Sequence, residues 1–302
     1  PALLILRQAL RPFFKQTRGT VLLGVSGGAD SMALAAAALL ERDGLDVIPV
    51  VVDHGLQKNS EIVAQTVKSR LEKLGFERVF LGRANVQLID GLEASARRAR
   101  YEVFEQAIET YGAELFLLAH NKNDQAEGVL LGLARGSGTK SLSGMKERNG
   151  IYVRPFLNIS REIIEQACQE AELEIWSDPH NENLEFTRVR VRREVLPKIE
   201  DDLGPGIIDA LSRSAKILGE DAQALDEWAE KALSEIGLNN LDVSELEKLP
   251  KAVRSRVLRR AIYAAGAPNG TLTSEHLEPV ESLVTAWKGQ GACALPGGVK
   301  VS

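Results

Sequence analysis

Apolar residues in the first half of the chain fall into short runs that alternate with segments of helical spacing. The runs are rich in Val, Leu, Ile and Phe, which is typical of buried strands, and apolar residues recur every three or four positions between them. Because strands that alternate with helices are joined by crossovers, we predict an α/β fold with a doubly wound, mostly parallel sheet. The predicted strands are residues 21–25, 47–52, 78–81 and 115–119, and the predicted helices are 31–42, 60–74 and 93–111.

The second half of the chain has a different pattern. Past Pro155 we find no regular alternation of strand and helix. Helical spacing appears in residues 160–171, 206–236, 243–266 and 274–288, with breaks at Gly204-Pro205, Asn239-Asn240 and Ala267-Pro268-Asn269-Gly270. We therefore predict an α/β domain over residues 1–198 and a helical C-terminal domain over 199–302.

The charge of the chain is unevenly distributed. The 302 residues are 44% hydrophobic, enough for two cores, and 37 basic against 42 acidic residues give a net charge of −5. Such a balance argues against a protein that coats nucleic acid over its whole surface. Acidic residues are concentrated, however: residues 162–185 carry eight and no basic residue, whereas 135–161, 186–198 and 251–260 have net charges of +5, +4 and +5. These basic segments are compatible with a local surface that binds nucleic acid.

Neither a membrane span nor a signal peptide is apparent. The most apolar region, residues 21–40, is interrupted by Gly27, Gly28 and Asp30, and the N-terminal residues lack the basic, apolar and small-residue pattern of a leader. We therefore expect a soluble cytoplasmic protein with no membrane partner.

A glycine pair lies between the first predicted strand and the first predicted helix. Adjacent glycines allow a tight turn with exposed amides, and the following helix adds its positive N-terminal end, so the turn is suited to bind an anion such as phosphate. Serine hydroxyls can donate to phosphate oxygens, and Asp30 can hold Mg²⁺ against them. A plain strand-to-helix turn is the alternative. The turn consists of Ser26, Gly27, Gly28, Ala29, Asp30 and Ser31, and no Gly-Lys-Ser/Thr of a Walker loop follows.

The sequence SGGxDS after a first strand is the signature of the PP-loop ATP pyrophosphatases, and further motifs resemble the tRNA(Ile)-lysidine synthetase family. The match extends from about residue 20 to about residue 200, and its specificity comes from the order of the motifs. They are Val52-Asp53-His54-Gly55-Leu56, Glu93-Ala94-Ser95-Ala96-Arg97 with Arg100-Tyr101, Ala119-His120, Asp124-Gln125-Ala126-Glu127, Arg135-Gly136-Ser137-Gly138, Arg154-Pro155 and Asp178-Pro179-His180-Asn181.

This resemblance implies a reaction with two steps. ATP adenylates the wobble cytidine of the isoleucine tRNA with a CAU anticodon and pyrophosphate leaves; the amino group of free L-lysine then displaces AMP to give lysidine. The implied cofactors are ATP and Mg²⁺. Residues 1–198 would be the ATP-binding catalytic domain and residues 199–302 the tRNA-binding domain. Both a monomer and a homodimer are compatible with the sequence.

The resemblance also implies roles for individual residues. Asp30 and Asp124 are expected to hold Mg²⁺ and, with Arg97, to form the catalytic set, although Asp124 also fits a helix N-cap. The ATP site is expected to consist of the glycine turn together with Asp53, His54, His120 and Arg188. The alternatives are a turn cap for Asp53 and His54, and a strand-end histidine bonded to backbone for His120.

One segment departs from the family pattern. Family members usually show two histidines and two aspartates where this chain has His120-Asn121-Lys122-Asn123-Asp124, so roles at positions 121 and 123 cannot be carried over. Val189 similarly replaces an asparagine of the family. Glu127, one helical turn beyond Asp124, is expected to steer the lysine ammonium or accept its proton, unless it is a solvated helix carboxylate.

Basic residues, together with Glu127, supply the predicted contacts with tRNA or substrate, and the alternative for each is a solvated surface. Arg97 and Arg100 are spaced i,i+3 and share a helix face, and the Gly-rich loop after Arg135 is expected to close over ATP or admit the anticodon unless it only ends a helix. The residues predicted to contact tRNA or substrate are Arg100, Glu127, Arg135, Arg192, Arg256 and Arg260.

The alternative function is sulfur transfer to tRNA by another PP-loop enzyme, such as a cytidine thiolase. Such enzymes need a reactive cysteine pair or an iron–sulfur cluster. The two cysteines, Cys168 and Cys293, lie neither in the glycine turn nor in a CxxC motif, which argues against that function.

Overall fold

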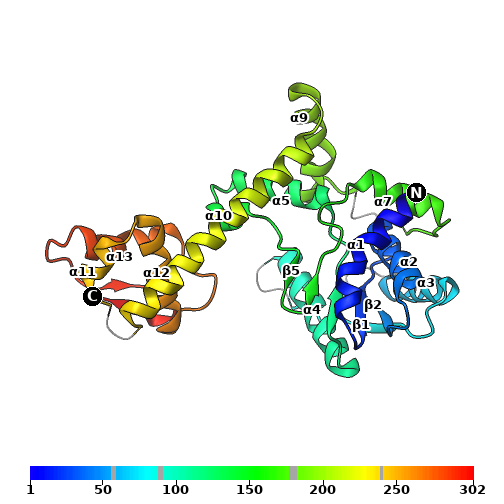
Figure 1. Ribbon diagram of the computed structural model, residues 1–302, viewed down its shortest axis with the longest axis horizontal. Helices are drawn as coiled ribbons and strands as arrows, with labels where there is room; N and C mark the ends of the chain where they lie inside the picture. The colour runs from blue at the N-terminus through cyan, green and yellow to red at the C-terminus, as the bar shows by residue number, and fades with distance from the viewer. Residues whose placement is uncertain (56–58, 88–90, 177–181, 239–240) are drawn as a thin grey trace. The chain divides into compact units, whose positions relative to one another are not determined.

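The computed structural model describes residues 1–55, 59–87, 91–176, 182–238 and 241–302, and its internal contacts divide the chain into two units (Figure 1). Unit 1 is Pro1–Lys216 and unit 2 is Ile217–Ser302, so the division falls within helix α10 (Ile207–Ile236). The first turns of α10 belong to unit 1 because Ile207, Ile208 and Leu211 pack against a small core around Ala126. A functional boundary after residue 198 stays a prediction.

Unit 1 alternates strands and helices in the predicted order. Each predicted strand and helix of the first half is present, with ends displaced by a few residues. The elements before α10 are α1 (Ala2–Gln16), β1 (Val21–Gly24), α2 (Ala29–Glu41), β2 (Val47–Asp53), α3 (Ser60–Leu74), β3 (Phe80–Arg83), α4 (Leu92–Tyr111), β4 (Leu115–Leu117), α5 (Lys122–Ala134), α6 (Thr139–Leu142), β5 (Arg148–Asn149), β6 (Tyr152–Val153), α7 (Arg161–Glu170), α8 (Thr187–Arg190), the π-helical turn η2 (Val191–Val195) and α9 (Leu196–Leu203).

The six strands form one sheet in the order β3-β2-β1-β4-β6-β5. All neighbours are parallel except β5 and β6, which confirms the predicted mostly parallel sheet. The chain proceeds outward from β1 to β3 and then returns to place β4 on the other side of β1. The strand order therefore reverses between β1 and β4, and ligands of doubly wound sheets bind at the carboxyl ends of the strands at such a point.

Alternate residues of each strand face two different cores, as the pleat of a sheet requires. Val21 and Leu23 of β1 lie in a core shared with α1, α2 and α7, whereas Leu22 lies in a core with Phe104 of α4. Figure 1 shows α1 beside α2. Both faces are thus covered, which explains why the strands read as continuous apolar runs.

Unit 2 has its own core, built from α10 after Lys216 and from later helices. Residues 243–266, predicted as one helix, form two, because Pro250 lacks an amide hydrogen and disfavours helical backbone at Leu249. A two-stranded antiparallel ribbon that was not predicted accompanies the helices. The elements are α11 (Val243–Lys248), α12 (Lys251–Ala264), α13 (Ser274–Thr285), β7 (Cys293–Ala294), the 3₁₀ turn η3 (Pro296–Gly298) and β8 (Lys300–Val301).

In the described part of the chain, none of the helices combines the length and the apolar character that crossing a membrane requires.

Candidate active site

A cavity of about 750 Å³ lies at the carboxyl ends of β1, β2 and β4 in unit 1. It is lined by the glycine turn, the end of β2, one face of α4 and the start of α5, which is the place predicted from the reversal of strand order. The sequence-predicted residues that line it are Ser26, Gly28, Ala29, Asp30, Ser31, Asp53, His54, Arg97, Arg100, His120, Asp124 and Arg192.

The glycine turn is held by its own serines. Ser31 Oγ donates to the carbonyl of Gly28 (3.0 Å) and accepts from the amide of Ser26 (3.2 Å). Gly27 has φ +87°, and a Cβ there would lie 2.5 Å from Val67 Cγ2, so this position requires glycine. Helix α2 begins directly after Gly28 with no side-chain cap from the described residues. Its first amides are therefore available to an anion in the cavity.

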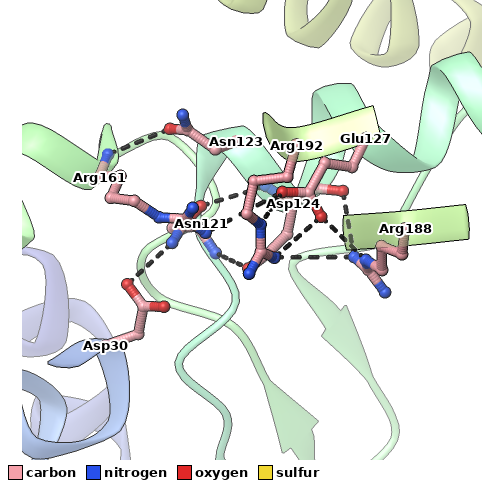
Figure 2. A network of polar contacts seen from close by, with 8 residues as sticks. All are labelled: Asp30, Asn121, Asn123, Asp124, Glu127, Arg161, Arg188 and Arg192. Carbon is pink, nitrogen blue, oxygen red and sulfur yellow. Dashed lines mark hydrogen bonds and ion pairs between the residues drawn. The ribbon is translucent and has the colours of Figure 1, made fainter. Parts of the chain in front are cut away.

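Asp30 and Asp124 approach each other through Asn121 (Figure 2). Asn121 Nδ2 donates to Asp30 Oδ1 (2.9 Å), and Asn121 Oδ1 accepts from the amide of Asp124 (3.1 Å). The amide of Asn121 in turn donates to Asp124 Oδ2 (2.9 Å), which completes a capping box at the start of α5. Asp124 is thus both a residue of the first turn of a helix and a cavity carboxylate.

Glu127 anchors a buried ion-pair cluster beside these carboxylates. Its side chain is fully buried, and its oxygens accept from Nε of Arg192 (2.6 Å) and from Nε of Arg188 (2.9 Å) (Figure 2). Arg192 Nη2 also donates to Asp124 Oδ1 (3.3 Å), and Arg161 Nη2 lies 4.0 Å from Glu127. Glu127 is therefore not a solvated helix carboxylate, which was the alternative considered from the sequence.

Burial and neighbouring charges act in opposite directions on the pKa values of this cluster. Burial raises the pKa of Asp30, and the positive charge of Arg161 only partly offsets that effect. Burial alone would lower the pKa of Arg192, but its hydrogen bond and ion pair with Glu127 prevail and raise it. Arg192 therefore stays positively charged. A cation that enters the cavity would stabilise the ionised form of Asp30, which burial disfavours.

His120 is partly buried and lies near several positively charged arginines. Burial lowers the pKa of His120 from 6.5 to about 3, and the charges of Arg154, Arg188, Arg97 and Arg100 contribute in the same direction. The imidazole is therefore neutral at physiological pH. A neutral ring can donate one hydrogen bond to a phosphate oxygen, but it cannot supply a proton as an imidazolium would.

We predict that the His120 ring does not titrate between pH 8 and about 5. Because the pKa of His120 is lower in the folded than in the unfolded chain, unfolding takes up a proton, and this contribution to stability is lost as pH falls from 6.5 toward about 3. NMR of histidine-labelled protein, assigned with a His120→Gln variant, measures the first effect. Denaturant unfolding at several pH values should show that His120→Gln loses less stability than wild type as the pH falls. A His120 ring that titrates near pH 6.5 would contradict the prediction.

The side of the cavity formed by β2 and α4 carries the remaining predicted ATP contacts. Asp53 accepts from the amide of Gly55 (2.9 Å); burial alone would raise its pKa, but hydrogen bonds from Ser60 and Gly55 prevail and lower it. Arg100 Nε lies 3.3 Å from His54 Nε2. Arg97 lies over the Tyr101 ring, 5.1 Å from its centroid. An ionised carboxylate and oriented arginines suit a ribose and a phosphate.

Other predicted residues lie outside the cavity lining. Gly27 has its carbonyl bonded to the amide of Trp176 (2.9 Å), the partly exposed Arg188 pairs with the buried Glu127, and Arg135 is exposed where α5 ends. In unit 2, the predicted basic face has acidic partners: Arg256 Nε donates to Asp226 (2.9 Å), and Arg260 lies 3.5 Å from Glu230. The segment Asp178-Pro179-His180-Asn181 lies outside the described residues.

Several residues of the site were not found from the sequence. Arg161, Arg193 and Trp176 line the cavity, and Asn123 Oδ1 accepts the amide of Arg161 (3.1 Å). The only sequence signal for Arg161 was its place at the end of the basic segment 135–161. Asn121 and Asn123, which appeared only as departures from a pattern, are structural parts of the site.

Comparisons with known proteins show the family of this chain. Residues 3–199 match the PP-loop domain family and residues 241–302 match the TilS substrate binding domain. The chain is 47% identical to the tRNA(Ile)-lysidine synthase of Streptomyces coelicolor over 94% of this chain and 82% of the relative, and 45% identical to that of Thermobifida fusca over 98% and 94%. A U34-tRNA thiolase NcsA from Methanococcus maripaludis, solved with its [4Fe-4S] cluster, shares the fold with a TM-score of 0.60 at 15% identity, over 72% of this chain and 80% of that one. The chain therefore belongs to the tRNA(Ile)-lysidine synthase family.

Proposed function

We propose that this family member adenylates the wobble cytidine of the isoleucine tRNA with a CAU anticodon and then attaches free L-lysine to give lysidine. Membership of the family makes it an ATP-dependent ligase that acts on tRNA(Ile). The observation that carries the finer proposal is the cavity at the reversal of strand order. There the glycine turn, two linked carboxylates and a set of arginines face one space.

We assign the triphosphate of ATP to the glycine turn and the start of α2. The amides of the turn and the Ser26 hydroxyl supply hydrogen bonds, and the helix N-terminus supplies positive potential. Neutral His120 donates to the α-phosphate or to the leaving pyrophosphate, and Arg97 and Arg100 offset the charge that develops on them. Asp53, kept ionised by its hydrogen bonds, accepts from the ribose or the adenine.

Asp30 and Asp124 fit a Mg²⁺ ion that is shared with the phosphates. Their carboxylates are hard oxygen donors on the cavity wall, and Mg²⁺ bound to a nucleotide usually takes one or two protein carboxylates. The described residues contain no cluster of three metal-ligating side chains, which agrees with an ion bound together with its substrate. When bound, Mg²⁺ would neutralise charge on the departing pyrophosphate.

Glu127 is proposed to attract the ammonium of the lysine substrate. Its oxygens bond Arg188 and Arg192, so an ammonium would have to replace one guanidinium as the counterion. Arg192 also lines the cavity, where the phosphates of ATP would offer it another anionic partner. On this proposal, ATP binding prepares the site for lysine.

The basic residues of unit 2 are proposed to contact the tRNA backbone, and Arg256 provides the test. Arg256→Ala is expected to weaken tRNA binding and to reduce the slope of log Kd against log salt concentration by about 1, because one phosphate contact is lost. Filter binding at several salt concentrations measures the slope. Arg78→Ala, which removes an exposed charge of unit 1, serves as the control. An unchanged slope for Arg256→Ala, or an equal change in both variants, contradicts a phosphate contact.

The overall proposal is tested by a single-turnover reaction with ATP, labelled lysine and a CAU-anticodon isoleucine tRNA transcript. We expect label to enter the tRNA and AMP to be released only when all three are present. A methionine tRNA transcript, which has the same anticodon, tests selectivity. Pyrophosphate release without lysine incorporation would reject the proposal, and incorporation of sulfur from an added donor would favour a thiolase.

A further inference from the structure

Asn121 is the residue through which two elements of the site meet. It precedes α5, and its side chain is fully buried between Asp30 of α2 and Asp124 of α5 (Figure 2). Among the described residues, the side-chain NH₂ group of Asn121 is the one that donates a hydrogen bond to the Asp30 carboxylate. The contact joins residues 91 positions apart in the chain.

The N-cap of α5 does not by itself require asparagine. An N-cap needs one side-chain oxygen that accepts an amide hydrogen, and Ser, Thr or Asp supply it as well as Asn does. Only the carboxamide adds an NH₂ group on the opposite side of the same planar unit. In Asn121 the oxygen serves Asp124 and the NH₂ group serves Asp30, so both bonds are fixed by one rigid group.

We propose that Asn121 is a positioning residue for adenylation, which fixes the Asp30 carboxylate relative to that of Asp124 through the two ends of its carboxamide. This inference rests on the proposed function, because the two carboxylates matter together only if they share a nucleotide-bound metal. Groups that orient metal-binding carboxylates by hydrogen bonds typically change metal affinity or activity 10- to 100-fold when they are removed.

The bonds of Asn121 also determine which carboxylate oxygens remain for a ligand. Asp30 Oδ1 and Asp124 Oδ2 are occupied by the side chain and the backbone amide of Asn121. Asp30 Oδ2 has no hydrogen bond in the described structure, and Asp124 Oδ1 faces Arg192 Nη2 at 3.3 Å. One oxygen of each carboxylate is thus fixed by Asn121. Asp30 Oδ2 is left for a shared ion, which would take the place of Arg192 Nη2 at Asp124 Oδ1.

Variants that keep the cap but lose the link separate this role from a merely structural one. Asn121→Ser retains an N-cap oxygen, Asn121→Ala removes both functions, and Asn121→Asp is isosteric but sets a third carboxylate against Asp30. We expect the melting temperature of the Ser variant to stay close to wild type and those of the Ala and Asp variants to fall, the last because a buried carboxylate would face Asp30. The single-turnover rate of pyrophosphate release, which reports adenylation, should fall about 10- to 100-fold in all three.

A second measurement does not depend on turnover. Mn²⁺ binding in the presence of a non-hydrolysable ATP analogue, followed by electron paramagnetic resonance, should weaken about 10-fold or more in Asn121→Ser. If wild type binds Mn²⁺ with the analogue but forms no lysidine, the proposed function fails while this inference is still tested. Wild-type turnover and Mn²⁺ affinity in Asn121→Ser overturn the inference; if that variant is unstable, the same result in Asn121→Asp overturns it.

Discussion

Replacing Asp30 by alanine is expected to slow adenylation of the tRNA by about 10²–10³-fold, because a fixed negative group that holds the metal at the phosphates is lost. The fold should persist. Burial raises the pKa of Asp30, so loss of this carboxylate removes an unfavourable buried charge, which offsets the hydrogen bond lost with Asn121. Rapid-quench measurement of pyrophosphate release from ATP, with tRNA in excess, gives the rate of this step.

The matched control for Asp30 is Asp43, which follows the other end of α2 and is exposed. Asp43 has φ +39°, a backbone conformation that asparagine tolerates, so Asp43→Asn removes one charge without straining the chain. Its adenylation rate should equal that of wild type. If Asp30→Ala retains more than a tenth of the wild-type rate while binding ATP normally, Asp30 does not hold the metal.

The sheet could be predicted because its signals are local. Continuous apolar strands flanked by amphipathic helices are visible in the sequence, and the order of strands then places their carboxyl ends at one edge. Ser26, Asp30, Asp53 and Asp124, the site residues expected from the turn and from the family resemblance, each follow one of these strands, and the structure places all four on one cavity. Strands β5 and β6 were missed because two residues are too short to show a period.

The polar cluster could not be predicted because its partners are distant in the chain. Glu127 pairs with Arg188 and Arg192, more than 60 residues later, and no spacing rule connects them. The same holds for Arg256, which appeared to lie in a purely basic segment but pairs with Asp226, 30 residues earlier. Sequence reasoning identified the residue types that do chemistry, but not which of them neutralise one another.

Asn121 illustrates the limit of comparison with a family pattern. At this position the sequence showed only that an expected histidine was absent. The structure shows that asparagine caps α5 and bonds Asp30 in the same place, so this residue connects α2 and α5. Substitutions inside a motif therefore have to be judged by the bonds the new side chain makes.

The second large effect is expected from Glu127→Gln, which should destabilise unit 1 by about 3 kcal/mol. Glutamine has the same shape but no charge, so the guanidinium groups of Arg188 and Arg192 lose their buried counterion. Breaking a buried ion pair from one side costs about 3–5 kcal/mol; the lower value applies because the arginine side chains are about one-third exposed and can regain water. Hydrogen exchange measured by mass spectrometry should show faster opening of α5 and of residues 187–203, with α12 and α13 unchanged.

Two controls determine whether the lost charge is the cause. Glu165→Gln alters an exposed carboxylate that lines the same cavity, and its effect should be within about 0.5 kcal/mol of zero. Adding Arg192→Met to Glu127→Gln removes one of the two cations that have lost Glu127, and Asp124 then has only the other to neutralise; this should recover part of the stability, so the two changes should not be additive. Equal protection of α5 in wild type and Glu127→Gln, or strict additivity in the double variant, would show that Glu127 is not the counterion on which this cluster depends.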